Sequence, residues 1–187
     1  MGKKLVVLFP GAGYHSDKPL LYYTKKIAKR YDYTIVELSF ELSEAASAIK
    51  GDREKTRMAL DTAFARACEK LGDIDFGRYD RVIFVGKSIG TAVMARYSAA
   101  FSVNAETVVF TPIAETFEYP GLRGPVFHGS ADPLLDTEKC LRLCEERGLP
   151  CTVIPKANHS LETGDVEKDV RNLGKVMKTV DGIFRRG

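Results

Sequence analysis

Residues 81–95 read RVIFVGKSIGTAVMA, and this stretch indicates a buried strand that turns sharply into a helix. Its apolar run at residues 82–85 is flanked by charge, as is typical of an interior strand of a parallel sheet. Small and apolar residues from Thr91 onward favour a helix packed closely on that sheet. Ser88 lies at the turn between the two elements, with a glycine two positions before it and another two positions after it.

This glycine spacing has a physical reason. A side chain at Gly86 or Gly90 would crowd the place where the helix crosses the strand, and a serine on such a turn projects its hydroxyl outward. The turn also puts Ser88 at a helix N-terminus, where unpaired backbone N–H groups favour negative charge. The pattern predicts a nucleophilic serine, and the alternative is a glycine-rich turn with an incidental serine. A P-loop is excluded, because Arg81 stands where that motif needs its first glycine.

Length and composition indicate an ordinary globular chain. Its 187 residues suit one domain over residues 1–187, and hydrophobic residues make up 44% and charged residues 28%. The net charge of +3 is too small to favour nucleic acid as a partner, and no basic run is interleaved with aromatic residues. We find no pattern of a secretory signal or a membrane span, so the expected location is the cytoplasm, away from membranes.

Strand and helix patterns alternate along the whole chain. Strands are expected at Lys4–Phe9, 33–38, 82–85, Glu106–Phe110, 125–128 and Cys151–Ile154. Helices are expected at Pro19–Arg30, Arg53–Leu71, from the serine turn to about residue 100, at 134–147 and at about 165–184. A partly helical connection is expected at 39–52 and an irregular loop at 111–124. This alternation predicts an α/β fold with a doubly wound, mostly parallel six-stranded sheet and helices on both faces.

Reactive residues follow three of the predicted strands. Ser88 follows the third strand, Asp132 the fifth and His159 the sixth. Because the carboxyl ends of parallel strands meet at one edge of a sheet, we expect these three side chains to lie close together. The chain order Ser, Asp, His is the order found in α/β-hydrolases.

The sequence resembles a compact α/β-hydrolase without a cap domain. The resemblance covers almost the whole chain, and its motifs are FPGAG at 9–13, GKSIG at 86–90, HGSADPL at 128–134 and ANHSLE at 157–162. It implies a serine hydrolase that cleaves a small carboxylic ester, a thioester or an amide through an acyl-enzyme intermediate. Ser88 is then the nucleophile, His159 the general base and later acid, and Asp132 the carboxylate that orients His159.

The resemblance also implies two backbone N–H donors for the oxyanion, those of Ile89 and Ala12. Pro10 stands where histidine is frequent in the first of these loops, so Gly13 and Tyr14 stay open as the second donor. Substrate-pocket walls are sought among apolar side chains on loops at the same edge of the sheet: Tyr14, Phe40, Phe117, Tyr119, Leu134 and Leu161. The expected partner is a small-molecule ester, and neither a metal nor an organic cofactor is expected.

Several of these residues have a second interpretation. Asp132 precedes Pro133 and could instead cap the helix expected from residue 134. Lys87 could add positive potential beside the nucleophile or point to water. His128 is expected to be a buried structural histidine, and His15 faces either the substrate or the solvent.

Cysteines and glycines suggest two further alternatives. The four cysteines are expected to be reduced, with Cys140 and Cys144 on one helix face as a possible metal pair that lacks a partner at ligand spacing. Gly11-x-Gly13 after the first strand and Glu37 after the second would suit a dinucleotide-binding module, but Ser16 replaces the third glycine. A non-catalytic binding protein on a hydrolase frame is the remaining alternative.

Overall fold

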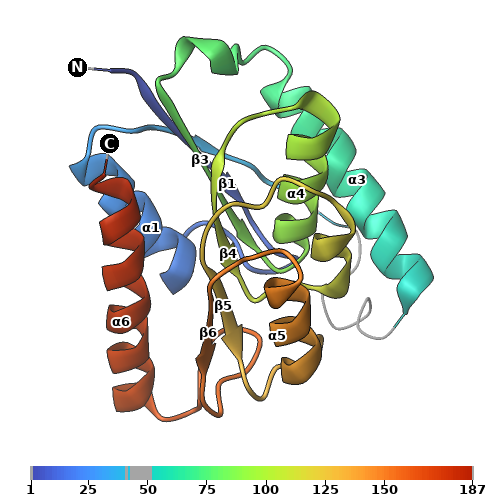
Figure 1. Cartoon of the computed structure of the whole chain (residues 1–187), viewed down its shortest axis with the longest axis vertical. Helices are drawn as coiled ribbons and strands as arrows, with labels where there is room; N and C mark the ends of the chain where they lie inside the picture. Colours follow the sequence, from blue (N-terminus) through green and yellow to red (C-terminus); the bar gives the residue numbers. More distant parts are fainter. Residues whose placement is uncertain (1, 41, 43–51, 187) are drawn as a thin grey trace.

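The computed structural model describes residues 2–40, 42 and 52–186 (Figure 1). Its centre is one parallel sheet of six strands in the order β2-β1-β3-β4-β5-β6. The strands are β1 (Lys4–Phe9), β2 (Thr34–Glu37), β3 (Arg81–Lys87), β4 (Glu106–Phe110), β5 (Val126–Gly129) and β6 (Cys151–Ile154). The predicted parallel, doubly wound sheet is confirmed. The winding direction reverses between β1 and β3, which puts a topological switch point beside the serine turn.

Helices cover both faces of this sheet (Figure 1). On one face, α1 (Pro19–Arg30) packs against α6 (Val166–Phe184). On the other face lie α3 (Arg53–Leu71), α4 (Ile89–Phe101) and α5 (Thr137–Glu145). Two short 3-10 helices, η1 (Phe76–Arg78) and η2 (Ala114–Glu118), lie in the connections. None of the helices in the described part of the chain combines the length and the apolar character that a membrane span requires.

The central strand β3 contributes side chains to two separate apolar cores, one on each face of the sheet. On β3, Phe84 points into the core under α3 and α4, whereas Ile83 and Val85 point into the core under α1 and α6. All three side chains are fully buried. The strand is therefore apolar along its length rather than alternating, because both of its faces are covered.

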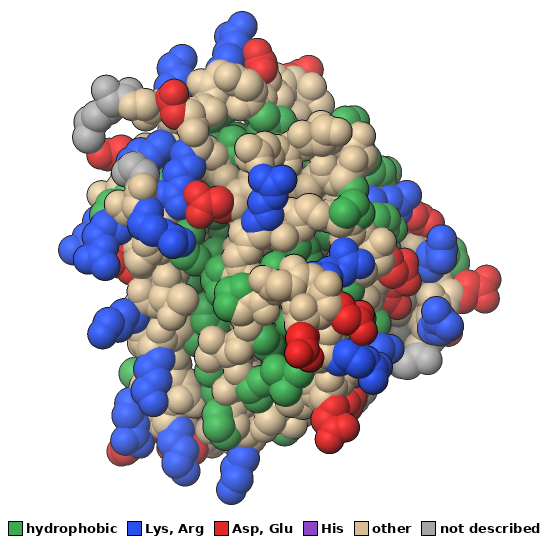
Figure 2. Space-filling view, in the orientation of Figure 1, with side chains coloured by type: hydrophobic (Ala, Val, Ile, Leu, Met, Phe, Trp, Pro, Cys, Tyr) green, Lys and Arg blue, Asp and Glu red, His purple; other side chains and the backbone are tan. Residues whose placement is uncertain are grey.

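The outer side of α6 is basic. In the space-filling view, Lys and Arg side chains gather at the edge of the molecule where α6 lies (Figure 2), and this helix carries exposed Lys168, Arg171, Lys175 and Lys178. Its inner side carries Val176 and Val180, which are buried against the sheet. The helix is thus amphipathic, as its sequence period predicts.

Most element boundaries agree with the sequence prediction, and α5 shows why one does not. It begins at Thr137 rather than at residue 134, because Asp136 is its N-cap and accepts a hydrogen bond from the Lys139 N–H at 3.0 Å. Residues 111–124 are not wholly irregular, since η2 lies within them. The connection predicted over residues 39–52 lies mostly outside the described residues.

Candidate active site

Ser88 occupies a strained position between β3 and α4. Its backbone has φ 56° and ψ −127°, a conformation that residues other than glycine rarely adopt. Such a residue costs on the order of 1–3 kcal/mol and persists only where its surroundings enforce it. Here the Ser88 N–H donates to the Phe110 carbonyl at 3.1 Å, and the Ser88 carbonyl accepts from the Thr91 N–H at 2.9 Å. The predicted strand–turn–helix around this serine is present.

The two glycines around Ser88 allow backbones to touch. A Cβ atom on Gly90 would lie 2.1 Å from the carbonyl oxygen of Phe9, and one on Gly86 would lie 2.8 Å from the Cα of Thr91. Neither separation is possible for real atoms. The glycine spacing therefore lets α4 begin directly against β1 and β3.

Three side chains form a continuous hydrogen-bonded chain at the carboxyl edge of the sheet. The Ser88 Oγ is 2.7 Å from the Nε2 of His159, and the Nδ1 of His159 is 2.7 Å from the Oδ2 of Asp132. The Asp132 carboxylate is fully buried, whereas the His159 side chain is 20% exposed. The structure thus brings together the three residues that follow β3, β5 and β6 in the sequence.

Close backbone contact between two loops brings Asp132 to His159. The Ala131 N–H donates to the Ala157 carbonyl at 2.8 Å, and a Cβ on Gly129 would lie 2.3 Å from that same oxygen. The Asn158 Oδ1 then accepts the Ser160 N–H at 2.7 Å, which fixes the turn that carries His159. The contact between Asp132 and His159 therefore requires a glycine at position 129.

The two oxygens of Asp132 have different partners. Its Oδ1 accepts the Leu134 N–H at 2.9 Å, which holds the local turn, and its Oδ2 faces His159. The helix cap that the sequence also allowed for Asp132 is made by Asp136 instead. Both oxygens of the buried carboxylate are thereby satisfied.

The surroundings shift the pKa values of both groups downward. Burial alone would raise the pKa of Asp132, but the hydrogen bond and the charge of His159 hold it below its usual value. Burial lowers the pKa of His159, the hydrogen bond to Asp132 opposes this, and the positive charge of Lys87 adds to the lowering. At neutral pH the imidazole is therefore uncharged, and its Nε2 can accept a proton from Ser88.

A cavity of about 360 Å³ opens beside Ser88 and His159. Of the predicted wall residues, Tyr14 and Leu134 line it. Phe117 and Leu161 do not, because η2 turns Phe117 into the core under α4 and the positive φ of Leu161 turns its side chain into the core under α6. Phe40 and Tyr119 border two other surface depressions.

A larger hollow lies at the opposite edge of the sheet. It measures about 890 Å³ and is bordered by Leu71, Tyr97 and Asn104. It contains none of the three hydrogen-bonded residues. We therefore take the smaller cavity as the candidate active site, because ligands of open α/β sheets bind at the carboxyl ends of the strands.

Both residues predicted to supply the oxyanion donors, Ile89 and Ala12, line the cavity beside Ser88. Ile89 is the first residue of α4, and Ala12 lies in a tight turn in which Gly11 and Tyr14 exchange two backbone hydrogen bonds of 3.1 Å. Within the described residues, no acceptor binds the N–H of Ile89, Ala12 or Gly13. The Tyr14 N–H is already bonded to Gly11, so it is the least suitable of the predicted donors.

Lys87 is the residue whose environment the sequence left undecided. Its side chain does not point to water but is 1% exposed and borders the cavity, with its ammonium 4.9 Å from the ring centre of Tyr14. Burial lowers the pKa of Lys87 to about 7, although the negative charge of Asp132 opposes the shift. No sequence signal distinguishes this orientation from a solvent-facing one.

The remaining histidines and the glycine-rich loop have no part in this chain of hydrogen bonds. His128 is fully buried, with its Nε2 3.2 Å from the Thr137 hydroxyl, while His15 is exposed. The Gly11–Tyr14 turn closes on itself, and α1 begins only at Pro19. The loop therefore does not lead into a helix N-terminus, as a dinucleotide-binding loop must.

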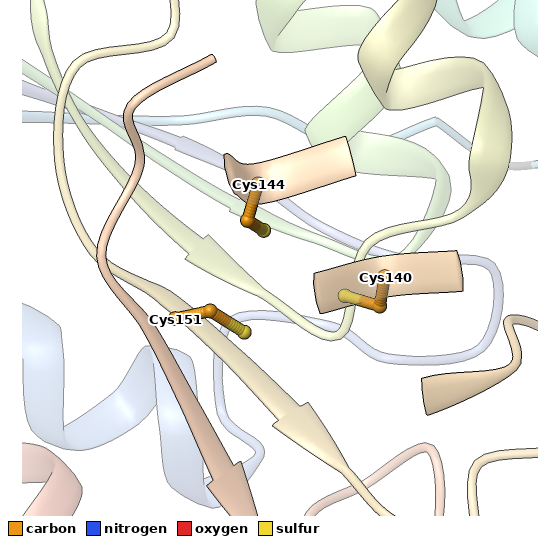
Figure 3. Close-up of side chains that lie close together, drawn as sticks. All are labelled: Cys140, Cys144 and Cys151. Atoms are coloured by element: carbon orange, nitrogen blue, oxygen red, sulfur yellow. The ribbon is translucent and has the colours of Figure 1, made fainter. Parts of the chain in front are cut away.

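Among the residues that the structure describes, three cysteines lie close enough together to hold a metal ion (Figure 3). Cys140 and Cys144 point from α5 toward Cys151 at the start of β6, and the three Sγ atoms all lie within 4.8 Å of one another. The sequence predicts only the pair on the helix. Cys151 has no sequence signal as a third ligand, because only the packing of β6 beneath α5 brings it close.

Comparisons by sequence and by structure give different results. No protein-family model matches the sequence, and no curated protein matches it either. Solved structures match over nearly the whole chain. An alpha-beta serine hydrolase homologue from Coxiella burnetii has a TM-score of 0.64 at 12% identity, over 94% of this chain and 84% of that one.

Two other solved structures extend this likeness. A serine hydrolase without a lid from Xanthomonas campestris has a TM-score of 0.59 at 17% identity, over 95% of this chain and 80% of that one. Est1E from Butyrivibrio proteoclasticus has a TM-score of 0.68 at 11% identity, over 99% and 88%. At such low identities the likeness concerns the fold. The fold of this chain is that of the α/β-hydrolase superfamily.

Proposed function

We propose that this protein is a serine hydrolase that cleaves a small carboxylic ester through an acyl-enzyme intermediate. The observation that carries the proposal is the hydrogen-bonded chain from Ser88 through His159 to Asp132 at the mouth of a cavity. A serine hydroxyl is nearly inert at neutral pH and needs an adjacent imidazole to remove its proton. The likeness in fold to serine hydrolases supports the same conclusion.

In the proposed reaction, the Ser88 Oγ attacks the ester carbonyl while the Nε2 of His159 takes the hydroxyl proton. Asp132 holds the imidazole in one tautomer and stabilises its charged form. The tetrahedral oxyanion is bound by the backbone N–H of Ile89 and of Ala12, each worth ~3 kcal/mol in such sites. Collapse expels the alcohol, which takes its proton from His159. Water, deprotonated by His159, then releases the carboxylic acid and restores Ser88.

An ester is favoured over an amide because an alkoxide is a better leaving group than an amide anion, and no residue of the site excludes a thioester. The cavity of about 360 Å³ is in the range of small-molecule sites, and it has aromatic Tyr14 and aliphatic Leu134 on its walls. Est1E, which is similar in fold, binds ferulic acid. An ester whose acyl group is of about that size is a suitable first substrate.

The experiment that tests the proposal is labelling with a fluorophosphonate, followed by peptide mass spectrometry. We expect one adduct, on Ser88, and no adduct in His159→Ala. Ser88→Ala should lose at least ~1,000-fold in ester hydrolysis while its thermal unfolding midpoint stays close to that of the wild type. A Ser88→Ala protein that keeps most of the activity, or a label on another residue, would overturn the mechanism.

A further inference from the structure

The cavity contains a buried lysine amine that has no carboxylate partner among the described residues. Lys87 is 1% exposed, and within the described residues it forms no ion pair and no hydrogen bond with a carboxylate. Its nearest described aromatic partner is the Tyr14 ring. Charged side chains are almost never buried in this way unless they are paired.

A second ammonium group lies next to the same ring. The Nζ of Lys18 is 5.6 Å from the ring centre of Tyr14, and Lys18 also borders the cavity. The Tyr14 hydroxyl accepts the Leu20 N–H at 3.1 Å, which fixes the ring in place. Burial raises the pKa of Tyr14 to about 12, so its hydroxyl stays neutral and cannot balance the two lysines.

The acidic groups around Lys87 are engaged or distant. Asp132 is bonded to His159 and to the Leu134 N–H, and Asp52 at the cavity rim caps α3 through the Lys55 N–H at 3.0 Å. Glu162 acts on Lys87 only through its charge and is exposed. Glu115, the other described acid at the rim, lines the cavity but forms no ion pair with Lys87. The positive charge beside the nucleophile is therefore available to a ligand.

We propose that Lys87 and Lys18 form an anion-binding subsite and that the substrate carries a carboxylate on its acyl group. This rests on the proposed hydrolase function. We place the carboxylate on the acyl group because Lys87 and Lys18 line the cavity beside Ser88, to which the acyl group becomes bonded. The preferred substrates would be half-esters of short dicarboxylic acids.

The test compares p-nitrophenyl hemiglutarate with the neutral ester p-nitrophenyl valerate. For the wild type we expect the ratio of the two kcat/KM values, anionic over neutral, to exceed ten. In Lys87→Met this ratio should fall at least tenfold, mainly through KM. The matched control is Lys25→Met, whose lysine is paired with Glu37 away from the cavity, and it should keep the wild-type ratio. Lys87→Gln serves if Lys87→Met does not fold.

A second measurement needs no turnover. Calorimetry should detect glutarate binding to Ser88→Ala, and this binding should weaken at least tenfold when Lys87→Met is added. Hydrolysis of the neutral ester with an unchanged ratio in Lys87→Met would overturn the subsite while the hydrolase stands. Glutarate binding by a protein that hydrolyses neither ester would overturn the hydrolase and leave the subsite.

A separate observation concerns the three cysteines under α5. Cys140 and Cys144 are buried, Cys151 is partly exposed, and all four cysteines of the chain are free thiols. Thiolates bound to Zn²⁺ at about 2.3 Å stand roughly 3.8–4.0 Å apart. The Sγ separations of at most 4.8 Å therefore need only small side-chain adjustments. Two elements supply these ligands, so a bound ion would join α5 to β6.

We infer that these three thiols form a site for Zn²⁺, in which binding releases three protons and leaves a fourth position to water. Cd²⁺ is the probe, because its thiolate bonds give an ultraviolet charge-transfer band. We expect one Cd²⁺ per reduced chain, a matching rise in the unfolding midpoint, and displacement of previously bound Zn²⁺ by Cd²⁺. Cys151→Ser should abolish these effects, and Cys68→Ser, outside the cluster, should not. No uptake by reduced protein, or uptake unaffected by Cys151→Ser, would overturn the site.

Discussion

At the scale of single residues, His159 links the chemistry to pH. As a general base it must be neutral, and burial lowers its pKa below the ordinary value near 6.5. The neutral form is populated above the pKa. We therefore expect kcat/KM for a neutral ester to rise with pH to a midpoint below 6.5 and to stay level above it.

Lys87 gives this profile a specific test. Its positive charge contributes to the low pKa of His159, so in Lys87→Met the acid midpoint should move to higher pH. With the wild type, a carboxylate-bearing ester should show an additional decline around pH 7, where Lys87 loses its proton. The measurement is kcat/KM from pH 4.5 to 9 for both esters. An acid midpoint at the same pH in Lys87→Met would contradict the coupling, and Lys25→Met is the control.

Residues also show what a sequence can and cannot predict. Ser88, Asp132 and His159 were predicted to meet, because each follows a strand whose end is fixed by parallel pairing. Phe117 was predicted as a pocket wall, but it is a core residue, since the direction of a loop side chain depends on packing. The burial of Lys87 could not be predicted from the sequence for the same reason.

At the scale of elements, the crossing of β1 and α4 depends on Gly90. Gly90→Ala would put a Cβ 2.1 Å from the Phe9 carbonyl oxygen, and neither backbone can move without disturbing the sheet. We expect the free energy of unfolding to fall by about 3 kcal/mol or more. Ester hydrolysis should fall with it, because Ala12 and Ile89 lie at this crossing. Urea unfolding followed by circular dichroism measures the first effect.

The matched control is Gly174→Ala, within α6. An added Cβ there meets no atom within 4 Å, and alanine has the higher helix propensity. We expect a gain of roughly 1 kcal/mol. A loss of stability in both variants would show that the contact distance at Gly90 is not the cause.

The presence of each helix could be predicted from the sequence, but its first and last residues could be predicted less well. The helices Pro19–Arg30 and Arg53–Leu71 were predicted with the bounds observed, because Pro19 and Gly72 mark their ends in the sequence. Helix α5 was predicted too long at both ends. At its start the reason is that Asp136 caps the helix, whereas Asp132, the cap that the sequence allowed, is bonded to the Leu134 N–H and to His159.

At the scale of the whole molecule, the sheet separates the layer of α1 and α6 from the layer of α3, α4 and α5. The candidate active site lies at its carboxyl edge, while α6 and α1 form a layer in which Phe184 packs against Tyr33 at the opposite edge. Arg81 joins this layer to β3, since it donates to the Ile183 carbonyl at 2.8 Å and pairs with Glu106 at 2.6 Å. Stability and chemistry should therefore be separable by mutation.

Phe184→Ala tests that separation. Phe184 is fully buried at the end of α6, and its ring centre is 4.9 Å from that of Tyr33. Its truncation should lower the free energy of unfolding by about 3–5 kcal/mol and the unfolding midpoint by roughly 10 °C. Val170→Ala, on the exposed side of the same helix, should change stability by no more than ~0.5 kcal/mol. Below its own unfolding transition, Phe184→Ala should hydrolyse esters with the wild-type kcat, because Phe184 packs against Tyr33, just before β2, at the opposite edge of the sheet from Ser88. A kcat that falls together with stability would mean that the α6 layer also orders the site.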